Sequence, residues 1–534
     1  MKRILVLLLA SVFVFGVWGT SVLAADNSSE IEQLKQEVNK LLNRLEQLEK
    51  KQNATETKTI ETEKKVTEVE KVTTKIEKEE AALKEEKKTR VISYYRDGWF
   101  LETPDKNFRL NISGVLHFDT RLYEAKGSSS SIDIRRARYD MRGYLYRGDI
   151  EHLFRLQLEM ADQPYLRNAY WMLKFRPELN IQLGQFKIPI GGADFLTEEA
   201  HLNFVEYGVD SPVAAFFDRG INIHSFFLDG RVQTNLGVFT GAGTDLDSPA
   251  GDLDSTKDYA ARLLLVPFKK SDNKFLKGLH FAGGYERGLQ SIKTTRGETN
   301  NRTENFESRW YRWRQNFVDL DKRTRYGGEF HWLVGPATLS YEFNRVQWDD
   351  ITVDLYPSSF NENWKQNFGS SNTPTRVPFP GDHHSDVHQV WLSYFLTGEQ
   401  KTFEDVFFCW RQPKPKKNFS LKDGTWGAWE VLARYAYHTN SSDLFNQPRV
   451  TVPGVGAVDP SILEGSQAGY SLTGGIRWIW NPKTRIMIDA NYLKSTKGDG
   501  IQIVDQKNGV SDQANSRYFK DSESAVLMRI IFTP

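Results

Sequence analysis

The feature that most constrains this chain is a hydrophobic period of two that recurs from about residue 96 onward. In the segment 108–124, apolar residues such as Leu110 and Ile112 fall on one face, and polar residues such as Asn111 and Asp119 fall on the other. Such alternation predicts β-strands with one apolar and one polar face. We predict sixteen strands, near residues 108–124, 132–147, 151–162, 165–176, 179–190, 219–230, 231–241, 257–268, 277–288, 323–335, 337–349, 385–397, 426–440, 467–481, 484–495 and 523–533.

The links between these strands alternate in length. Short links carry turn residues, as at Gly148-Asp149, Pro177-Glu178, Asp229-Gly230, Gly335-Pro336 and Pro482-Lys483, whereas long links cover roughly 191–218, 289–322, 350–384, 441–466 and 496–522. One long link, 398–425, falls on the side of the barrel where the other links are short. Short turns opposite long loops are typical of bacterial outer-membrane barrels, whose closure leaves no free sheet edge in the bilayer. The pattern predicts an all-β transmembrane fold, a 16-stranded antiparallel outer-membrane β-barrel, although fourteen or eighteen strands also fit.

The N-terminal residues predict export. Two basic residues precede an apolar run over residues 4–17, and the small residues Ala24 and Ala25 follow. This order is that of a secretory signal peptide, which we assign to residues 1–25. The alternative is a membrane anchor, but the run is shorter than the roughly 20 residues that a spanning helix needs.

Residues 26–90 have a different period. Ile31, Leu34 and Val38 begin a series of apolar residues spaced alternately three and four apart, with charged residues between them. This spacing predicts an α-helical coiled coil, which we place in the periplasm, but it does not fix the number of helices. For residues 51–90, a lone charged helix or a disordered tether is the alternative.

Composition excludes several classes of function. Lysine and arginine number 70 against 69 aspartate and glutamate, so no strongly basic surface for nucleic acid is indicated. The single cysteine, Cys409, excludes an intramolecular disulfide framework and a multi-cysteine metal site. No Ser/His/Asp or paired-acid group suggests catalysis, so we expect neither an enzyme nor a cofactor.

One cluster has the composition of a loose metal site. Residues 381–388 contain His383, His384 and His388 together with two aspartates. These are ligand types for a divalent metal. The cluster falls in the predicted sixth external loop, where polar residues are the default, and we therefore expect no metal there.

Five segments, in family order across residues 97–534, resemble the phosphate-selective porin O and P family. They are Ile134-Arg-Arg-Ala-Arg138, Gly184-Gln-Phe-Lys187, Tyr394-Phe-Leu-Thr-Gly-Glu399, Gly427-Ala-Trp-Glu430 and Trp478-Ile-Trp-Asn-Pro482. The resemblance implies a trimeric sixteen-stranded barrel, over residues 91–534, whose third external loop folds into the channel. Our independent strand count makes 191–218 that third loop.

The second predicted strand carries a cluster of arginines. Arg136, Arg138 and Arg142 share its polar face with Asp140. By the resemblance, Arg135 and Arg136 align with an arginine pair that lines the constriction in phosphate-selective relatives. A guanidinium stays charged and offers a planar fork to oxyanions. The alternative is that these arginines only solvate the wall or pair with carboxylates. The expected pore-lining residues are Arg109, Arg135, Arg136, Arg138, Arg142 and Arg262.

Two departures from the family affect the expected selectivity. The relatives carry lysines in the third loop, whereas this chain has Asp194, Glu198, Glu199, Glu206 and Asp210, and it has Val115 where they place an arginine. An acidic loop that faces an arginine wall resembles a general diffusion porin. We expect a homotrimeric channel in the outer membrane of a Gram-negative cell, in contact with lipid, that passes small hydrophilic solutes, with anions such as phosphate favoured. The alternative is a weakly selective porin whose coiled coil also tethers the outer membrane to the cell wall.

Overall fold

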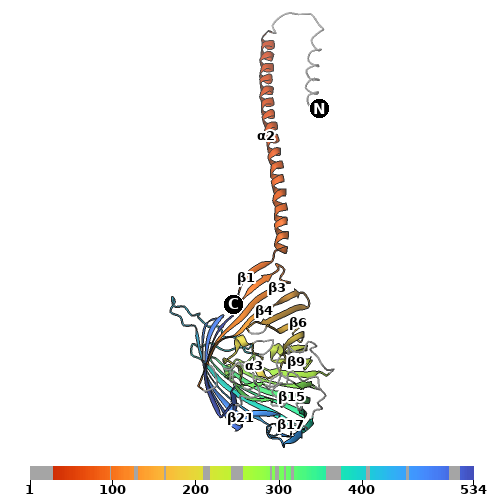
Figure 1. Cartoon of the computed structure of the whole chain (residues 1–534). Coiled ribbons are helices and arrows are strands. Elements are labelled where there is room, and N and C mark those ends of the chain that lie inside the picture. The colour runs from red at the N-terminus through yellow and green to blue at the C-terminus, as the bar shows by residue number, and fades with distance from the viewer. Residues whose placement is uncertain are drawn as a thin grey trace. The chain divides into compact units, whose positions relative to one another are not determined.

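The structure is a computed structural model that describes residues 28–533 apart from 97, 125–129, 162–163, 209–216, 242–255, 289–291, 295–299, 306–307, 314–317, 356–374, 404–408, 453–455 and 504–517. The chain divides into two compact units between Lys88 and Thr89 (Figure 1). The predicted signal peptide lies outside the described residues.

The first unit contains one long helix, α2 (Ser28–Thr89), of 62 residues. At 1.5 Å per residue, the helix is about 93 Å long. The predicted seam residues Leu34, Val38 and Leu41 are 50–59% exposed in the single chain. The helical prediction is confirmed, whereas the coiled coil stays a prediction. Within the described residues, no helix is both long enough and apolar enough to span a bilayer.

The second unit is a closed antiparallel barrel (Figure 1). Among the described residues, sixteen strands pair each with the next, and the last strand pairs with the first, so the predicted barrel is confirmed. The barrel strands are β3 (Arg109–Tyr123), β4 (Ser131–Arg147), β5 (Glu151–Glu159), β6 (Tyr165–Arg176), β7 (Leu179–Lys187), β8 (Phe217–Phe227), β9 (Val232–Phe239), β10 (Asp258–Leu265), β11 (Leu279–Gly288), β15 (Val318–Val334), β16 (Ala337–Leu355), β17 (Thr375–Phe395), β18 (Ala428–Asn440), β21 (Leu463–Asn481), β22 (Thr484–Gly498) and β25 (Ser522–Phe532).

The remaining elements are short and belong to the links. They are β1 (Ile92–Tyr95), β2 (Trp99–Glu102), β12 (Ile292–Thr294), β13 (Asn300–Arg302), β14 (Ser308–Trp313), β19 (Val450–Val452), β20 (Gly456–Val458), β23 (Ile501–Ile503), β24 (Tyr518–Lys520), α3 (Gly192–Leu196), α4 (Lys274–Lys277), η1 (Glu199–His201), η2 (Leu228–Gly230) and η5 (Ser442–Leu444). β2 extends the sheet by pairing with the start of β3.

The two ends of the barrel differ as the sequence predicted. We call the end with the short links the turn end and the other the loop end. The predicted external loop 350–384 is wrong in its bounds, because β16 continues to Leu355 and β17 begins at Thr375. These extended strand ends contribute Ile351, Val353 and Phe379 to a buried apolar cluster, and that packing stabilises strand beyond the predicted limits.

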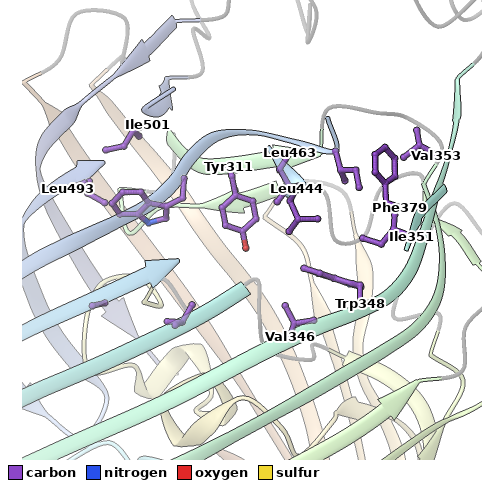
Figure 2. Close-up of a cluster of buried hydrophobic side chains, with 14 of the residues drawn as sticks. Tyr311, Val346, Trp348, Ile351, Val353, Phe379, Leu444, Leu463, Leu493 and Ile501 are labelled. Carbon is purple, nitrogen blue, oxygen red and sulfur yellow. The ribbon is translucent and has the colours of Figure 1, made fainter. Parts of the chain in front are cut away.

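This apolar cluster fills one side of the barrel interior at the loop end. It joins side chains from β16, β17 and β22 to residues of three loop segments, including Tyr311 of β14, Leu444 of η5 and Ile501 of β23 (Figure 2). Val346 belongs to it and pairs with Arg325, a buried residue on the inner face. An interior packed with apolar side chains excludes water. This part of the interior is therefore closed to water.

Candidate functional site

The chain between β7 and β8 enters the barrel and crosses it. We call residues 188–208 the inner loop. At its start, Gly191 and Gly192 have φ angles of 102° and 87°, a left-handed backbone that favours glycine. A Cβ on Gly192 would lie 2.2 Å from Glu342 Oε2, and a Cβ on Gly284 of β11 would lie 2.9 Å from Ile190 Cδ1. Glycine at these positions therefore lets the loop lie directly against the inner wall.

Two wall carboxylates hold the first turn of the inner loop. Glu329 Oε2 accepts a hydrogen bond from the Ala193 amide at 2.8 Å, and Glu342 Oε1 accepts one from the Asp194 amide at 3.0 Å. The Asp194 carboxylate accepts hydrogen bonds from Gln389 Nε2 at 2.8 Å and Trp391 Nε1 at 2.7 Å. Burial raises the pKa of Asp194. This predicted constriction residue thus anchors the loop to β17.

Glu198 and Glu199 bind arginines on the opposite wall. Arg155 Nη1 lies 2.6 Å from Glu198, and Arg138 Nη1 lies 2.6 Å from Glu199, which also pairs with Arg167. Burial opposes ionisation of Glu198, but the Arg155 guanidinium outweighs burial and lowers the Glu198 pKa to about 2. The pKa of Glu199 is likewise held well below its usual range by Arg138 and Arg167, against the effect of burial. Both carboxylates are charged and neutralise the wall.

Glu206 pairs with arginines of β4 and β25, the two strands that flank β3 where the barrel closes. Its Oε1 lies 3.1 Å from Arg135 Nε of β4 and 2.5 Å from Arg529 Nη2 of β25, and its Oε2 lies 3.9 Å from Arg136 Nη2. Arg529 also forms a two-pronged pair with Asp119 of β3, at 2.7 Å for each contact. Against the effect of burial, the arginines hold the Glu206 pKa well below its usual range.

Arginines also bind the backbone of the inner loop. Four loop carbonyls accept hydrogen bonds from guanidiniums on β18, β21, β22 and β25. The pairs are Arg485 to Ala200 at 2.6 Å, Arg477 to Asn203 at 2.6 Å, Arg434 to Glu206 at 3.3 Å, and Arg529 to Val205. These contacts fix the path of the loop across the barrel.

A second segment enters the barrel from the turn end. The unusually long link 396–427 carries Trp410, which is fully buried and whose amide donates to Thr197 Oγ1 of the inner loop at 2.8 Å. Lys401 on the same link lies 2.7 Å from both Asn203 Oδ1 and Glu430 Oε1. The length of this link was visible in the sequence, but its inward path was not. The link supports the inner loop from the side opposite the one where that loop enters.

The structure divides the six predicted pore-lining arginines into two groups. Arg135, Arg136 and Arg138 pair with inner-loop carboxylates, and Arg262 forms a bidentate pair with Glu329, with contacts of 2.6 and 2.8 Å. Arg109 and Arg142 differ: among the described residues, neither is ion-paired with a carboxylate. Of the predicted loop acids, Asp210 lies outside the described residues.

Sequence reasoning missed the guanidiniums on the later strands. Arg529 lies between Met528 and Ile530, on the polar face of an alternating segment, so its inward direction was predictable. Its partner Glu206 lies 323 residues away in the sequence, and that pairing follows only from barrel closure.

A cavity of about 430 Å³, which we call the turn-side cavity, lies between the inner loop and the turn end. Its wall consists mainly of residues of β3 to β9. Phe100 of β2, Cys409 of the link 396–427 and residues of the inner loop such as Glu198 also line it. Five cationic side chains line the cavity, against one carboxylate, Glu198: they are Arg109, Arg142, Arg155, Lys174 and Lys187. Burial and the nearby Arg485 lower the pKa of His201 to about 4, so this imidazole is neutral at pH 7. The cavity is therefore electropositive.

Two groups of metal-ligand residue types occur in the described chain. Ligand atoms of Glu329, His331 and Glu342 lie within 4.8 Å of one another. Both carboxylates already bind loop amides, and Glu329 also binds Arg262, so their chemistry is accounted for by anchoring the loop. In the predicted histidine cluster, His383 is buried and binds Asp443, whereas His388 binds Tyr341 among exposed residues. These histidines lie in β17 instead of the predicted loop and do not converge.

The chain matches the family model for phosphate-selective porin O and P over residues 109–367 and 386–513. No functionally curated protein matches it. Similar solved structures include OmpT in trimer form, an outer membrane protein of Vibrio cholerae (12% identity, TM-score 0.42, covering 80% of this chain and 99% of that one). Another is OmpF of Salmonella typhi in complex with daunomycin (10% identity, TM-score 0.42, covering 83% of this chain and 100% of that one). A third is the outer membrane channel DcaP of Acinetobacter baumannii (8% identity, TM-score 0.43, covering 81% of this chain and 99% of that one).

The family match and the closed barrel agree with each other. The matched residues extend over the barrel strands from β3 to β22. Together they support a channel in the outer membrane and point away from an enzyme. The chain belongs to the phosphate-selective porin O and P family.

Proposed function

We propose that the chain forms a water-filled channel for passive diffusion of small hydrophilic solutes, with a modest preference for anions instead of a dedicated phosphate site. The observation that carries this proposal is the pairing of wall arginines with inner-loop carboxylates. A guanidinium that already binds a carboxylate has few donors left for a phosphate oxygen. The lumen near the inner loop is therefore close to neutral, and the excess positive charge lies in the turn-side cavity.

The test is the reversal potential of the purified full-length protein in a planar bilayer that separates two chloride concentrations. We expect a potential that indicates a weak preference for anions. We also expect the chloride current to decrease only in proportion to the amount of phosphate added. Block of the chloride current by micromolar phosphate would overturn the weak selectivity and show that wall arginines are available to oxyanions. No conductance at all would overturn the channel itself.

We also propose that the helix α2 extends into the periplasm and associates with copies of itself in a homotrimer. The exposed apolar seam of Leu34, Val38 and Leu41 supports association, because burial in a coiled coil would remove this surface from water. A helix of about 93 Å is long enough to link the outer membrane to the cell wall. Deletion of residues 26–90 is expected to weaken envelope cohesion and leave single-channel conductance unchanged. Normal envelope integrity in the deletion strain would contradict the tether.

A further inference from the structure

We propose that the turn-side cavity is a binding site for organic anions with an apolar body, of which aromatic carboxylates are the simplest class. This inference rests on the proposed channel function, because the ligand reaches the cavity through the lumen. Two features carry it: cations that no carboxylate among the described residues neutralises, and an apolar strip on a wall that is otherwise polar.

The available cations are Arg109, Arg142 and Lys174. No described carboxylate is ion-paired with any of them. Arg142 makes one long contact, 3.4 Å from Nε to Asn111 Oδ1, and Arg109 lies over the Phe100 ring at 4.4 Å from the centroid. Both arginines keep N–H donors that are available to a carboxylate. A planar guanidinium binds a carboxylate through two parallel hydrogen bonds. A single acidic group can therefore be bound without displacing the inner loop.

The apolar strip consists of Tyr144, Leu153 and Met172. Tyr144 pairs with Leu153 across β4 and β5, and Leu153 pairs with Met172 across β5 and β6. Directly paired residues of antiparallel strands lie on one face with Cβ atoms about 4.5–5.5 Å apart, so the three side chains form one continuous surface. Tyr144 and Leu153 are partly exposed, whereas Met172 is 3% exposed and only completes the strip. Porin lumens are polar, so three adjacent apolar residues facing inward are a departure that a simple diffusion path does not require.

The cations border this strip on two sides. Arg109 pairs with Tyr144 across β3 and β4, and Arg142 precedes Tyr144 by two residues on the same face. Lys174 follows Met172 by two residues on the same face of β6. A ligand that places a carboxylate beside Arg142 therefore rests its apolar body on Tyr144 and Leu153, the partly exposed members of the strip.

The size and the remaining lining fit the same ligand class. A volume of about 430 Å³ lies within the range of roughly 300–1,000 Å³ that is usual for small-molecule sites. Phe186 and Leu196 add apolar surface, and the one lining carboxylate, Glu198, is neutralised by Arg155. An inorganic anion would use the cations but leave the strip in contact with water. An organic anion gains from both features.

The direct test is isothermal calorimetry on the purified full-length protein in detergent, with benzoate, acetate and neutral benzyl alcohol as probes. Benzoate is expected to bind at least about tenfold more tightly than either acetate or benzyl alcohol, since each comparison removes one of the two contacts. The variant Arg142→Gln/Lys174→Gln is expected to weaken benzoate binding about tenfold. The matched control, Lys422→Gln/Arg449→Gln, removes two exposed cations and should leave affinity unchanged.

A parallel measurement separates this site from the channel proposal. Chloride conductance in planar bilayers reports the channel and the folding of each variant, and benzoate is expected to block that current in the wild type and less in the cavity variant. Equal affinity for benzoate and acetate, or equal losses in the cavity variant and its control, would overturn the site even if chloride current is normal. Absence of chloride current would overturn the proposed function, while calorimetry would still decide whether the cavity binds benzoate.

Discussion

Strand β4 contains two regions that look alike in sequence and differ in structure. In its loop-side half, Arg136 and Arg138 are buried and pair with Glu206 and Glu199 of the inner loop. Four residues after Arg138, on the same inner face, Arg142 is exposed and has no described carboxylate as an ion-pair partner. The difference shows that, on the same inner face, the inner loop pairs with the arginines of one half of the strand and leaves Arg142 in the other half exposed.

The comparison also separates stability from selectivity. A buried arginine that neutralises a loop carboxylate contributes to the position of the loop, and losing it leaves an uncompensated buried charge. An exposed arginine beside the cavity contributes to the potential that a passing ion meets. Three experiments test whether these roles are distinct.

The largest expected effect is on stability. Arg138→Gln leaves Glu159 without its pair and Glu199 with one arginine fewer, and should lower the free energy of unfolding by about 3–5 kcal/mol. Arg142→Gln should change it by less than about 0.5 kcal/mol. Denaturation by guanidinium, followed by tryptophan fluorescence on the purified protein, measures both. Similar losses in the two variants would remove the distinction between the two halves of β4.

The next effect is on selectivity. Glu206→Gln removes the carboxylate shared by Arg135 and Arg529 and adds net positive charge beside the inner loop. One charge about 6 Å from the ion path in a water-like medium is worth about 0.7 kcal/mol, favourable for chloride and unfavourable for potassium. The chloride-to-potassium permeability ratio should therefore rise roughly tenfold. Reversal potentials in a potassium chloride gradient measure this ratio.

Glu178→Gln is the matched control for that change. Glu178 is an exposed carboxylate in the turn between β6 and β7, 3.9 Å from Arg176. The Glu178→Gln substitution should leave the permeability ratio unchanged. If the chloride-to-potassium permeability ratio also stays constant in Glu206→Gln, the arginines released from Glu206 do not affect the passing ions.

The smallest expected effect is that of pH. Burial opposes the charge on Glu198, but Arg155 lowers its pKa to about 2, below its ordinary value of 4.5. The stabilisation from this pair is complete above pH 4.5 and is lost as the pH falls towards 2. Conductance and selectivity should therefore be constant between pH 7 and 5 and change only as the pH approaches 2, whereas the stability contributed by the pair begins to fall below about pH 4.5. A change of selectivity between pH 7 and 5 would contradict the charged state of the inner loop.

The fold was predictable because alternation and link length are local signals. A period of two and turn residues such as Pro177 and Gly335 are visible within a dozen residues, and they predicted all sixteen strands. The ends of β16 and β17 were not predictable, because Ile351 and Phe379 are held in strand by a cluster that includes Leu444 and Ile501. That cluster depends on how distant loops pack.

The candidate site was predictable only in part. Sequence placed Arg138 and Arg142 on one polar face and Glu199 in a loop inside the channel, and the structure shows these positions. Which arginine meets a carboxylate depends on strand register and on the path of the inner loop. The contact of Trp410 with Thr197 joins segments 213 residues apart, and no local pattern encodes it.

Arg529 lies in the last strand of the barrel and binds both Asp119 of the first strand and Glu206 of the inner loop. This last strand closes the sheet by pairing with the first strand. Until it joins the first strand, Glu206 lacks its shortest ion pair and the Val205 carbonyl lacks its arginine donor. The inner loop therefore gains these contacts only when the sheet has closed, so the position of the loop is coupled to barrel closure.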